Sequence, residues 1–204
     1  MADLLLAGID EVGRGSLAGP VAVVAASFLM SEEELLRNEL RNVLRREPTD
    51  SKKLTLLARE RGNAFLKGRI AWGLGMASAA EIDEKGIVGA TTLAATRALD
   101  GLTARPDKVL ADAGLFHGYE KEIPTERFVK GDETYLPIMT ASIIAKVARD
   151  TFMRELSVHH PHYAWEKNVG YGSAAHRAAI TAYGLTEYHR RSFLKSYMDD
   201  AARP

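Results

Sequence analysis

Runs of hydrophobic residues predict the strands of a sheet. Residues 4–9 are apolar apart from one glycine and are followed by Asp10. A second apolar run, rich in valine and alanine, covers 21–29 directly after Pro20. The glycines between the two runs predict a loop or hairpin connection. Further short strands are predicted at 70–77, 109–112 and 127–129.

Apolar residues at helical spacing predict the helices. Ser31 with Glu34 and Ser78 with Glu81 match the capping box, so we expect a helix to begin at each place. The pair at Ser78 precedes a short helix and then a longer one. The remaining periodicity predicts helices over about 55–66, 87–99, 140–156 and 173–183, the first capped by Thr55 and the last ended by Gly184.

This order of elements predicts an α/β or α+β fold with helices on a central sheet, because strands dominate the first part of the chain and helices the rest. The 204 residues contain no repeat and no long linker. We therefore expect a single domain over 1–204, in which residues from about 157 form a helical C-terminal subregion.

Composition excludes several classes of protein. The chain has no cysteine, which rules out disulfides, thiolate zinc sites and a thiol nucleophile. Its longest nearly apolar stretch, ten residues, is about half of what a bilayer span requires. We expect a cytoplasmic globular protein without a membrane segment or signal peptide. The 27 Lys and Arg balance the 27 Asp and Glu, which by itself argues mildly against a nucleic-acid partner.

Acidic residues follow three of the predicted strands: Asp10 with Glu11, then Asp112, then Asp132. A lone aspartate at such a place is more often a turn or cap residue. Neighbouring strands place their ends side by side, however, so these acids are expected to converge. Converged carboxylates must be neutralised, and oxygen ligands without Cys or His select Mg²⁺ or Mn²⁺. Two such ions can promote phosphodiester cleavage.

The sequence around these acids resembles type 2 ribonucleases H (the ribonuclease HII family). Five blocks occur in the family's order: D-E-V-G-R-G at 10–15 with L-A-G-P at 17–20, D-S-K-K-L at 50–54, K-G-D at 130–132 with A-S-I-I-A-K-V-A-R-D at 141–150, G-Y at 170–171, and H-R-R-S-F at 189–193. A single block is weak, but five in order are specific. Arg14, where type 3 relatives carry lysine, favours type 2.

The resemblance implies a ribonuclease H-like fold, with a central mixed β-sheet flanked by helices and a small helical C-terminal part. It implies an endonuclease that cuts the RNA strand of RNA–DNA hybrids and nicks DNA duplexes at single embedded ribonucleotides, with roles in RNA primer removal and ribonucleotide excision repair. The family's catalytic, metal-binding carboxylates map onto Asp10, Glu11, Asp112 and Asp132. They would hold two divalent cations, Mn²⁺ or Mg²⁺, and leave 5′-phosphate and 3′-hydroxyl ends.

Substrate contacts follow from the same resemblance. Gly13, Arg14 and Gly15 form a tight turn by composition, and by resemblance they recognise the ribose 2′-hydroxyl. Tyr171, between two glycines, would stack on the deoxynucleotide next to the ribonucleotide. The candidate phosphate contacts are Lys52, Ser142, Lys146 and Arg190.

Other polar residues near these blocks receive different roles. Asp150 is expected to support the site or to pair with Arg149 rather than to bind metal. Five of the six histidines follow residue 158 without a zinc-binding spacing, and are interpreted as turn residues or as partial cations near phosphates. The neutral total charge is then explained by an acidic metal centre beside a basic track for the duplex.

Three positions depart from the family pattern: Ala113 stands for a usual glycine, Thr140 for an alanine, and Gly172 for a proline or alanine. Another metal-dependent nuclease of the same broad fold, acting on DNA, and a non-catalytic hybrid-binding module remain as alternatives. Residues 196–204 contain no clear sliding-clamp peptide, and a monomer is the default expectation.

Overall fold

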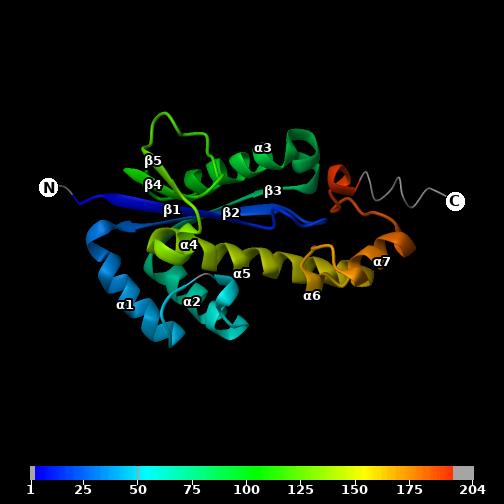
Figure 1. Ribbon diagram of the computed structural model, residues 1–204, viewed down its shortest axis with the longest axis horizontal. Helices are drawn as coiled ribbons and strands as arrows, with labels where there is room; N and C mark the ends of the chain where they lie inside the picture. Colours follow the sequence, from blue (N-terminus) through cyan, green and yellow to red (C-terminus); the bar gives the residue numbers. More distant parts are fainter. Residues whose placement is uncertain (1–2, 50, 195–204) are drawn as a thin grey trace.

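A five-stranded mixed sheet forms the centre of the computed structural model, which describes residues 3–49 and 51–194 (Figure 1). The strand order is β3-β2-β1-β4-β5. β2 (Val21–Leu29) pairs antiparallel with both β1 (Leu5–Val12) and β3 (Ala71–Ala77). β4 (Lys108–Asp112) runs parallel to β1, and β5 (Thr125–Phe128) runs parallel to β4. The carboxyl ends of β1, β4 and β5 therefore lie at one edge of the sheet.

Helices cover both faces of the sheet (Figure 1). α3 (Ala79–Asp100) packs on one face, where its alanines meet alternate residues of β1, β2 and β4. α5 (Leu136–His159), supported by α1 (Glu33–Leu44) and α2 (Leu56–Arg69), packs on the other. A Cβ on Gly8 would lie 1.9 Å from the carbonyl carbon of Pro137, so glycine lets α5 approach β1 closely. The predicted sheet flanked by helices is confirmed.

A third hydrophobic cluster lies beyond the sheet, around Trp165 and Met153. It joins the second half of α5 to the helical C-terminal part that the sequence predicted. The short elements there are η3 (Pro161–Tyr163), α6 (Trp165–Asn168) and α7 (Ala174–Tyr183). The other short elements are η1 (Met30–Glu32), η2 (Ser51–Lys53) and α4 (Gly131–Thr134).

The two predicted capping boxes have different outcomes. At α3, Ser78 Oγ accepts the Glu81 amide at 3.2 Å and Glu81 Oε2 accepts the Ser78 amide at 2.8 Å, which confirms that box. A non-helical Gly86 then separates the short and long helical segments that were predicted. The box at Ser31 is wrong. Ser31 lies in η1 and donates its hydroxyl to the Asp3 carboxylate, and α1 begins without a side-chain cap.

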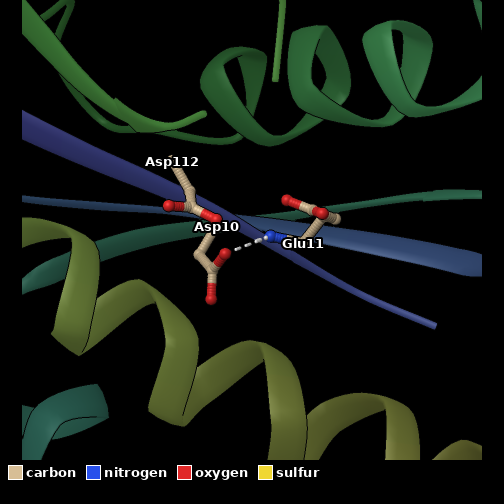
Figure 2. A group of neighbouring side chains, drawn as sticks. All are labelled: Asp10, Glu11 and Asp112. Atoms are coloured by element: carbon tan, nitrogen blue, oxygen red, sulfur yellow. Dashed lines mark hydrogen bonds between the residues drawn. The ribbon is translucent and has the colours of Figure 1, made fainter. Parts of the chain in front are cut away.

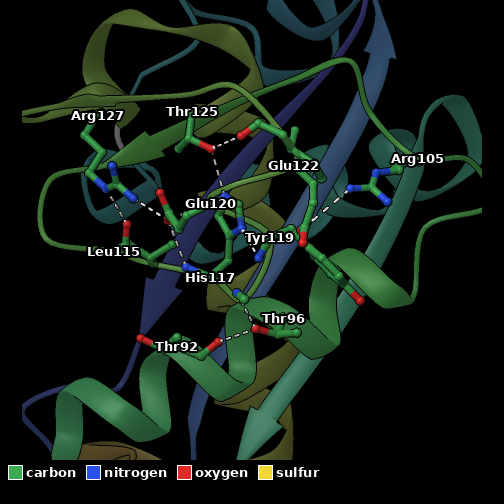
Figure 3. Close-up of polar contacts among 12 residues, drawn as sticks. Thr92, Thr96, Arg105, Leu115, His117, Tyr119, Glu120, Glu122, Thr125 and Arg127 are labelled. Carbon is green, nitrogen blue, oxygen red and sulfur yellow. Dashed lines mark hydrogen bonds and ion pairs between the residues drawn. The ribbon is translucent and has the colours of Figure 1, made fainter.

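The connection between β4 and β5 is held by polar contacts to α3 and β5 (Figure 3). The Gly118 amide donates to Thr96 Oγ1 at 2.8 Å, and Arg127 Nε donates to the Leu115 carbonyl at 2.9 Å. Inside the connection, the His117 amide donates to Glu120 Oε1 at 3.1 Å. These bonds fix the turn that follows Asp112.

Within 3–49 and 51–194, no helix combines the length and apolarity that a membrane crossing requires.

Candidate active site

Three acidic side chains meet at the edge of the sheet where β1 and β4 end. Ile9 is the register partner of Ala111 on the parallel strands β1 and β4. Asp10 and Asp112, the next residue on each strand, therefore lie side by side. One carboxylate oxygen from each of Asp10, Glu11 and Asp112 lies within 4.8 Å of the others. Figure 2 shows the three side chains between α3 and α5. The predicted convergence is confirmed for these three of the four acids.

Mutual repulsion and burial act on this group. Burial raises the pKa of Asp10 well above its ordinary value; Glu11, Asp132 and Asp112 raise it further, against a hydrogen bond from Ser142. Burial also raises the pKa of Glu11, as does Asp112, while Arg14 and Lys52 oppose this rise. The charged carboxylates therefore lack sufficient compensation from the protein alone.

The donor set fits a divalent cation. Glu11 Oε2 is buried and has no hydrogen-bond partner among the described residues. The Glu11 amide donates to Asp10 Oδ1 at 2.9 Å, and this bond orients the Asp10 carboxylate (Figure 2). Closely spaced carboxylate oxygens with an unused acceptor are suited to Mg²⁺ or Mn²⁺.

Asp132 stands apart from the three clustered acids. It lies in the first turn of α4, past the end of β5, and is 8% exposed. The Gly131 amide donates to Asp112 Oδ1 at 3.1 Å, which ties this turn to the cluster. Asp132 is close enough to raise the pKa of Asp10 without belonging to the 4.8 Å group.

The turn at 13–15 rests on a buried arginine. Arg190 donates from Nη2 to the Gly13 carbonyl at 2.7 Å, from Nη1 to the Arg14 carbonyl at 2.9 Å, and from Nε to the Gly19 carbonyl at 3.0 Å. Its side chain is 0% exposed. The predicted phosphate contact by Arg190 is wrong, because its guanidinium is enclosed and faces backbone carbonyls.

A second buried arginine, Arg149, joins the turn to the segment before Tyr171. Its Nε donates to the Pro20 carbonyl at 3.0 Å and its Nη1 to the Val169 carbonyl at 2.7 Å. Its Nη2 donates to Ser16 Oγ at 2.7 Å and to the Ala18 carbonyl at 3.1 Å. A Cβ on Gly13 would lie 2.0 Å from Arg149 Nε, and the φ of Gly13 is +84°, so only glycine fits there. Burial, and to a smaller extent the neighbouring Arg149, lower the pKa of Arg190 to about 9.

Sequence reasoning missed the role of Arg149, considering it only as a partner of Asp150. A signal was present: Arg149 is spaced with Ala145 and Met153 on the buried stripe of α5. Asp150 instead bonds Lys146 Nζ at 2.9 Å, and its other oxygen lies 3.9 Å from Arg59 Nη1. The predicted pairing of Asp150 with Arg149 is therefore wrong.

Tyr171 presents its ring at the surface beside the turn at 13–15. The residue is 39% exposed, and the Arg149 guanidinium carbon lies 5.7 Å from its ring centroid. The Gly170 carbonyl accepts the amides of Leu17 and Ala18 at 2.8 and 3.2 Å. The segments 13–20 and 169–172 thus form one hydrogen-bonded unit.

The other predicted contacts are arranged around the carboxylates. Ser142 is buried, bonds Asp10 and lies 2.9 Å from Ser51 Oγ, so it supports the acid; a phosphate contact by Ser142 stays a prediction. Lys52 is exposed and close enough to lower the pKa of Glu11. Lys146 is ion-paired with Asp150.

The three departures from the family pattern are accommodated locally. Ala113 keeps a negative φ, because the turn after β4 places its positive φ, +80°, on Gly114. The buried Thr140 donates its hydroxyl to the Pro137 carbonyl at 2.8 Å. A Cβ on Gly172 would lie 2.8 Å from Leu17 Cδ1, so glycine suits this neighbour.

Comparisons with known proteins agree with this geometry. A profile of the ribonuclease HII family matches residues 7–196. The ribonuclease HII of Thermosynechococcus vestitus is 46% identical over 201 residues, which cover 96% of this chain and 86% of that protein. That of Bacteroides thetaiotaomicron is 43% identical over 192 residues, 94% of this chain and 90% of that protein. The crystal structure of ribonuclease H2 from Pyrococcus horikoshii OT3 is similar with a TM-score of 0.78 and 25% identity, covering 98% of this chain and 100% of that one. The chain belongs to the ribonuclease HII family and is a ribonuclease H, a hydrolase.

Proposed function

We propose that this ribonuclease H cleaves the RNA strand of RNA–DNA hybrids and also nicks duplex DNA on the 5′ side of a single embedded ribonucleotide, leaving 5′-phosphate and 3′-hydroxyl ends. The observation that carries the proposal is the carboxylate cluster beside the unit formed by 13–20 and 169–172. A cluster of this kind supplies the chemistry, and the adjoining unit presents backbone groups and a ring to the substrate.

Asp10, Glu11, Asp112 and Asp132 would hold two divalent cations, Mg²⁺ or Mn²⁺. When bound, such ions activate a water for attack and stabilise the leaving oxygen at the scissile phosphate. The protein's own contribution is to keep the carboxylates close and oriented, through the Glu11 amide on Asp10 and the Gly131 amide on Asp112. The buried, unpartnered Glu11 Oε2 supports this assignment.

The turn at 13–15 is proposed to recognise the 2′-hydroxyl, which is both a donor and an acceptor and distinguishes RNA from DNA. Nothing lies within 4 Å of a Cβ built on Gly15, so the outer side of this turn is open to a ligand. Arg14, whose side chain is 36% exposed and lies 3.8 Å from Glu11, is placed to clamp an adjacent phosphate. Lys52 and Lys146 are proposed to bind phosphates further along the strand.

Tyr171 is proposed to stack on the deoxynucleotide next to the ribonucleotide and so to select an RNA-to-DNA junction. Its exposed ring beside the turn supports this role. A Tyr171→Ala variant should lose cleavage at a single ribonucleotide more than it loses binding to plain duplex DNA. Equal losses of both would make Tyr171 a structural residue only.

In the cell, the proposed activity would serve RNA primer removal and ribonucleotide excision repair, in the cytoplasm and as a monomer. The prediction that the tail lacks a sliding-clamp peptide concerns 196–204, which lie outside the described residues.

The test is cleavage of a DNA duplex that carries one ribonucleotide, in Mg²⁺ and in Mn²⁺. The wild type should nick it on the 5′ side of the ribonucleotide and leave the matched all-DNA duplex intact, whereas Asp10→Asn should bind the duplex without nicking it. Preference for the all-DNA duplex would identify a different nuclease of this fold. Binding without cleavage by folded wild type in either ion would identify a non-catalytic module.

A further inference from the structure

Two buried histidines lie beneath Tyr171. His176, in α7, is 0% exposed and its Nδ1 lies 2.9 Å from the Tyr171 carbonyl. Its Nε2 lies 3.1 Å from Nε2 of His189, which is 2% exposed. Both belong to the cluster around Trp165. Because both are buried, the prediction of partial cations near phosphates is wrong for these two, whereas His189 is a turn residue as predicted, its amide donating to the Thr186 carbonyl at 3.2 Å.

Their partners assign one protonation state to each ring. The Trp165 indole can only donate, and its Nε1 lies 3.0 Å from His176 Nε2, so that nitrogen accepts. The proton of His176 is therefore on Nδ1, which donates to the Tyr171 carbonyl. The Thr186 amide donates to His189 Nδ1 at 3.0 Å, so His189 carries its proton on Nε2. This N–H and the Trp165 indole N–H share His176 Nε2 as their acceptor. A second proton on His176 would face the Trp165 indole N–H, and one on His189 would face the Thr186 amide, so each would bring two donors together.

The surroundings do not favour a charged imidazole. The charged side chains that act on the pair are Arg177 and Arg191, both cations. The rings that act on the pair are those of His160, Tyr163 and Trp165, and Tyr188 packs against His160 and Trp165. Burial lowers the pKa of both histidines, that of His189 to about 4.

We propose that His176 and His189 are positioning residues that hold Tyr171 for contact with the nucleotide next to the ribonucleotide. The chain of donors runs from Thr186 through His189 and His176 to the Tyr171 carbonyl, and it fixes the backbone from which the ring projects. The Ser173 amide also bonds this carbonyl, at 2.8 Å, so the residue is held from its C-terminal side by α7. The inference rests on the proposed role of Tyr171.

The first test measures the imidazole nitrogens directly. Long-range ¹H–¹⁵N spectra of the whole protein at pH 6 should show His176 as the neutral Nδ1–H tautomer and His189 as the neutral Nε2–H tautomer. The exposed His159 serves as the internal reference for a ring outside the buried pair. A charged ring at either buried position, or the opposite tautomer, would overturn the proposal whatever the nuclease activity.

The second test separates positioning from general support. His176→Leu removes the donor, and we expect it to raise KM about tenfold for the duplex with one ribonucleotide. Cleavage of a continuous RNA–DNA hybrid should stay within about twofold. His176→Asn places an amide near the former Nδ1 and should restore most of the KM, while His159→Leu should change neither activity.

Unchanged KM in His176→Leu, or equal loss on both substrates, would overturn the proposal. The proposed function fails differently. If Tyr171→Ala does not affect the single-ribonucleotide substrate, the role of Tyr171 is wrong and the positioning role falls with it, even when the spectra show the expected tautomers.

Discussion

Arg190→Lys tests whether this arginine anchors the turn at 13–15 or contacts the substrate. The guanidinium of Arg190 is a planar fork that reaches three carbonyls, those of Gly13, Arg14 and Gly19. Lysine keeps the positive charge, but all its donors are on one nitrogen at the end of a flexible chain. It therefore cannot bond all three carbonyls. The substitution therefore removes the anchor while retaining a cation.

The expected loss of stability follows from the hydrogen bonds. If lysine keeps one carbonyl, two buried carbonyls lose a bond to a charged donor, each worth about 1.5–3 kcal/mol. The lower end of this range for each of the two carbonyls gives a decrease of about 3 kcal/mol in the free energy of unfolding. With a urea m-value of about 2 kcal/mol/M, the unfolding midpoint should fall by about 1.5 M.

Salt dependence of substrate binding distinguishes the two roles. A lost phosphate contact lowers the slope of log Kd against log salt concentration by about one, whereas a lost anchor weakens binding without changing that slope. Lys52→Gln is the matched control: Lys52 is exposed beside the carboxylates, so its substitution should change the slope by about one and leave stability nearly unchanged. An Arg190→Lys protein with an unchanged urea midpoint and a reduced slope would refute the anchoring role.

Three further predictions concern the cluster, the sheet and the buried histidines. Asp10→Asn should abolish cleavage yet raise the unfolding free energy of the metal-free protein at pH 8 by about 1–3 kcal/mol, because it removes a buried charge beside other acids; a less stable variant in urea with EDTA would contradict this. Gly8→Ala should lower the free energy of unfolding by about 3 kcal/mol or more, because the new methyl group would overlap the Pro137 backbone. The control Gly68→Ala, in α2 with open space around it, should leave the stability in thermal melts unchanged or raise it. The pKa of His189 in the folded protein, about 4, lies below its ordinary value of 6.5, so the unfolded chain binds this proton more tightly. The folded state should therefore have its full stability above about pH 6.5 and lose up to about 3 kcal/mol of unfolding free energy as the pH falls toward 4. His189→Gln should flatten that part of the stability profile, and an unchanged profile would show that His189 does not titrate there.

The elements that sequence predicted well are those whose signal is local. The apolar run at 21–29 coincides with β2, Thr55 caps α2 as expected, and the helix predicted at 173–183 is α7. The failure at Ser31 is instructive, because the capping box there has the same residue types as at Ser78. Asp3 is 28 positions away and captures the Ser31 hydroxyl, and no local pattern contains that competitor.

The candidate site divides in the same way. Asp10 and Asp112 were predictable because parallel neighbours end at one edge of the sheet. The partners of Arg190 were not, since Gly13 and Arg14 lie more than 170 positions earlier. A family motif marks Arg190 as important without showing whether it faces solvent or backbone, and its burial decides that it supports the turn.

The zero net charge conceals two separate groups of uncompensated charge. Within the described residues, neither Arg149 nor Arg190 forms an ion pair. Their guanidinium groups donate instead to carbonyls and to one hydroxyl in segments that lack regular secondary structure. Buried backbone carbonyls need donors, and a guanidinium supplies several at once in a fixed geometry. These two buried cations therefore bond the unit formed by 13–20 and 169–172 internally and add no exposed guanidinium to its surface. Under the proposed function, attraction of the duplex would depend on other cations, such as the partly exposed Arg14 and the exposed Lys52, and on neutralisation of the carboxylate cluster by bound metal.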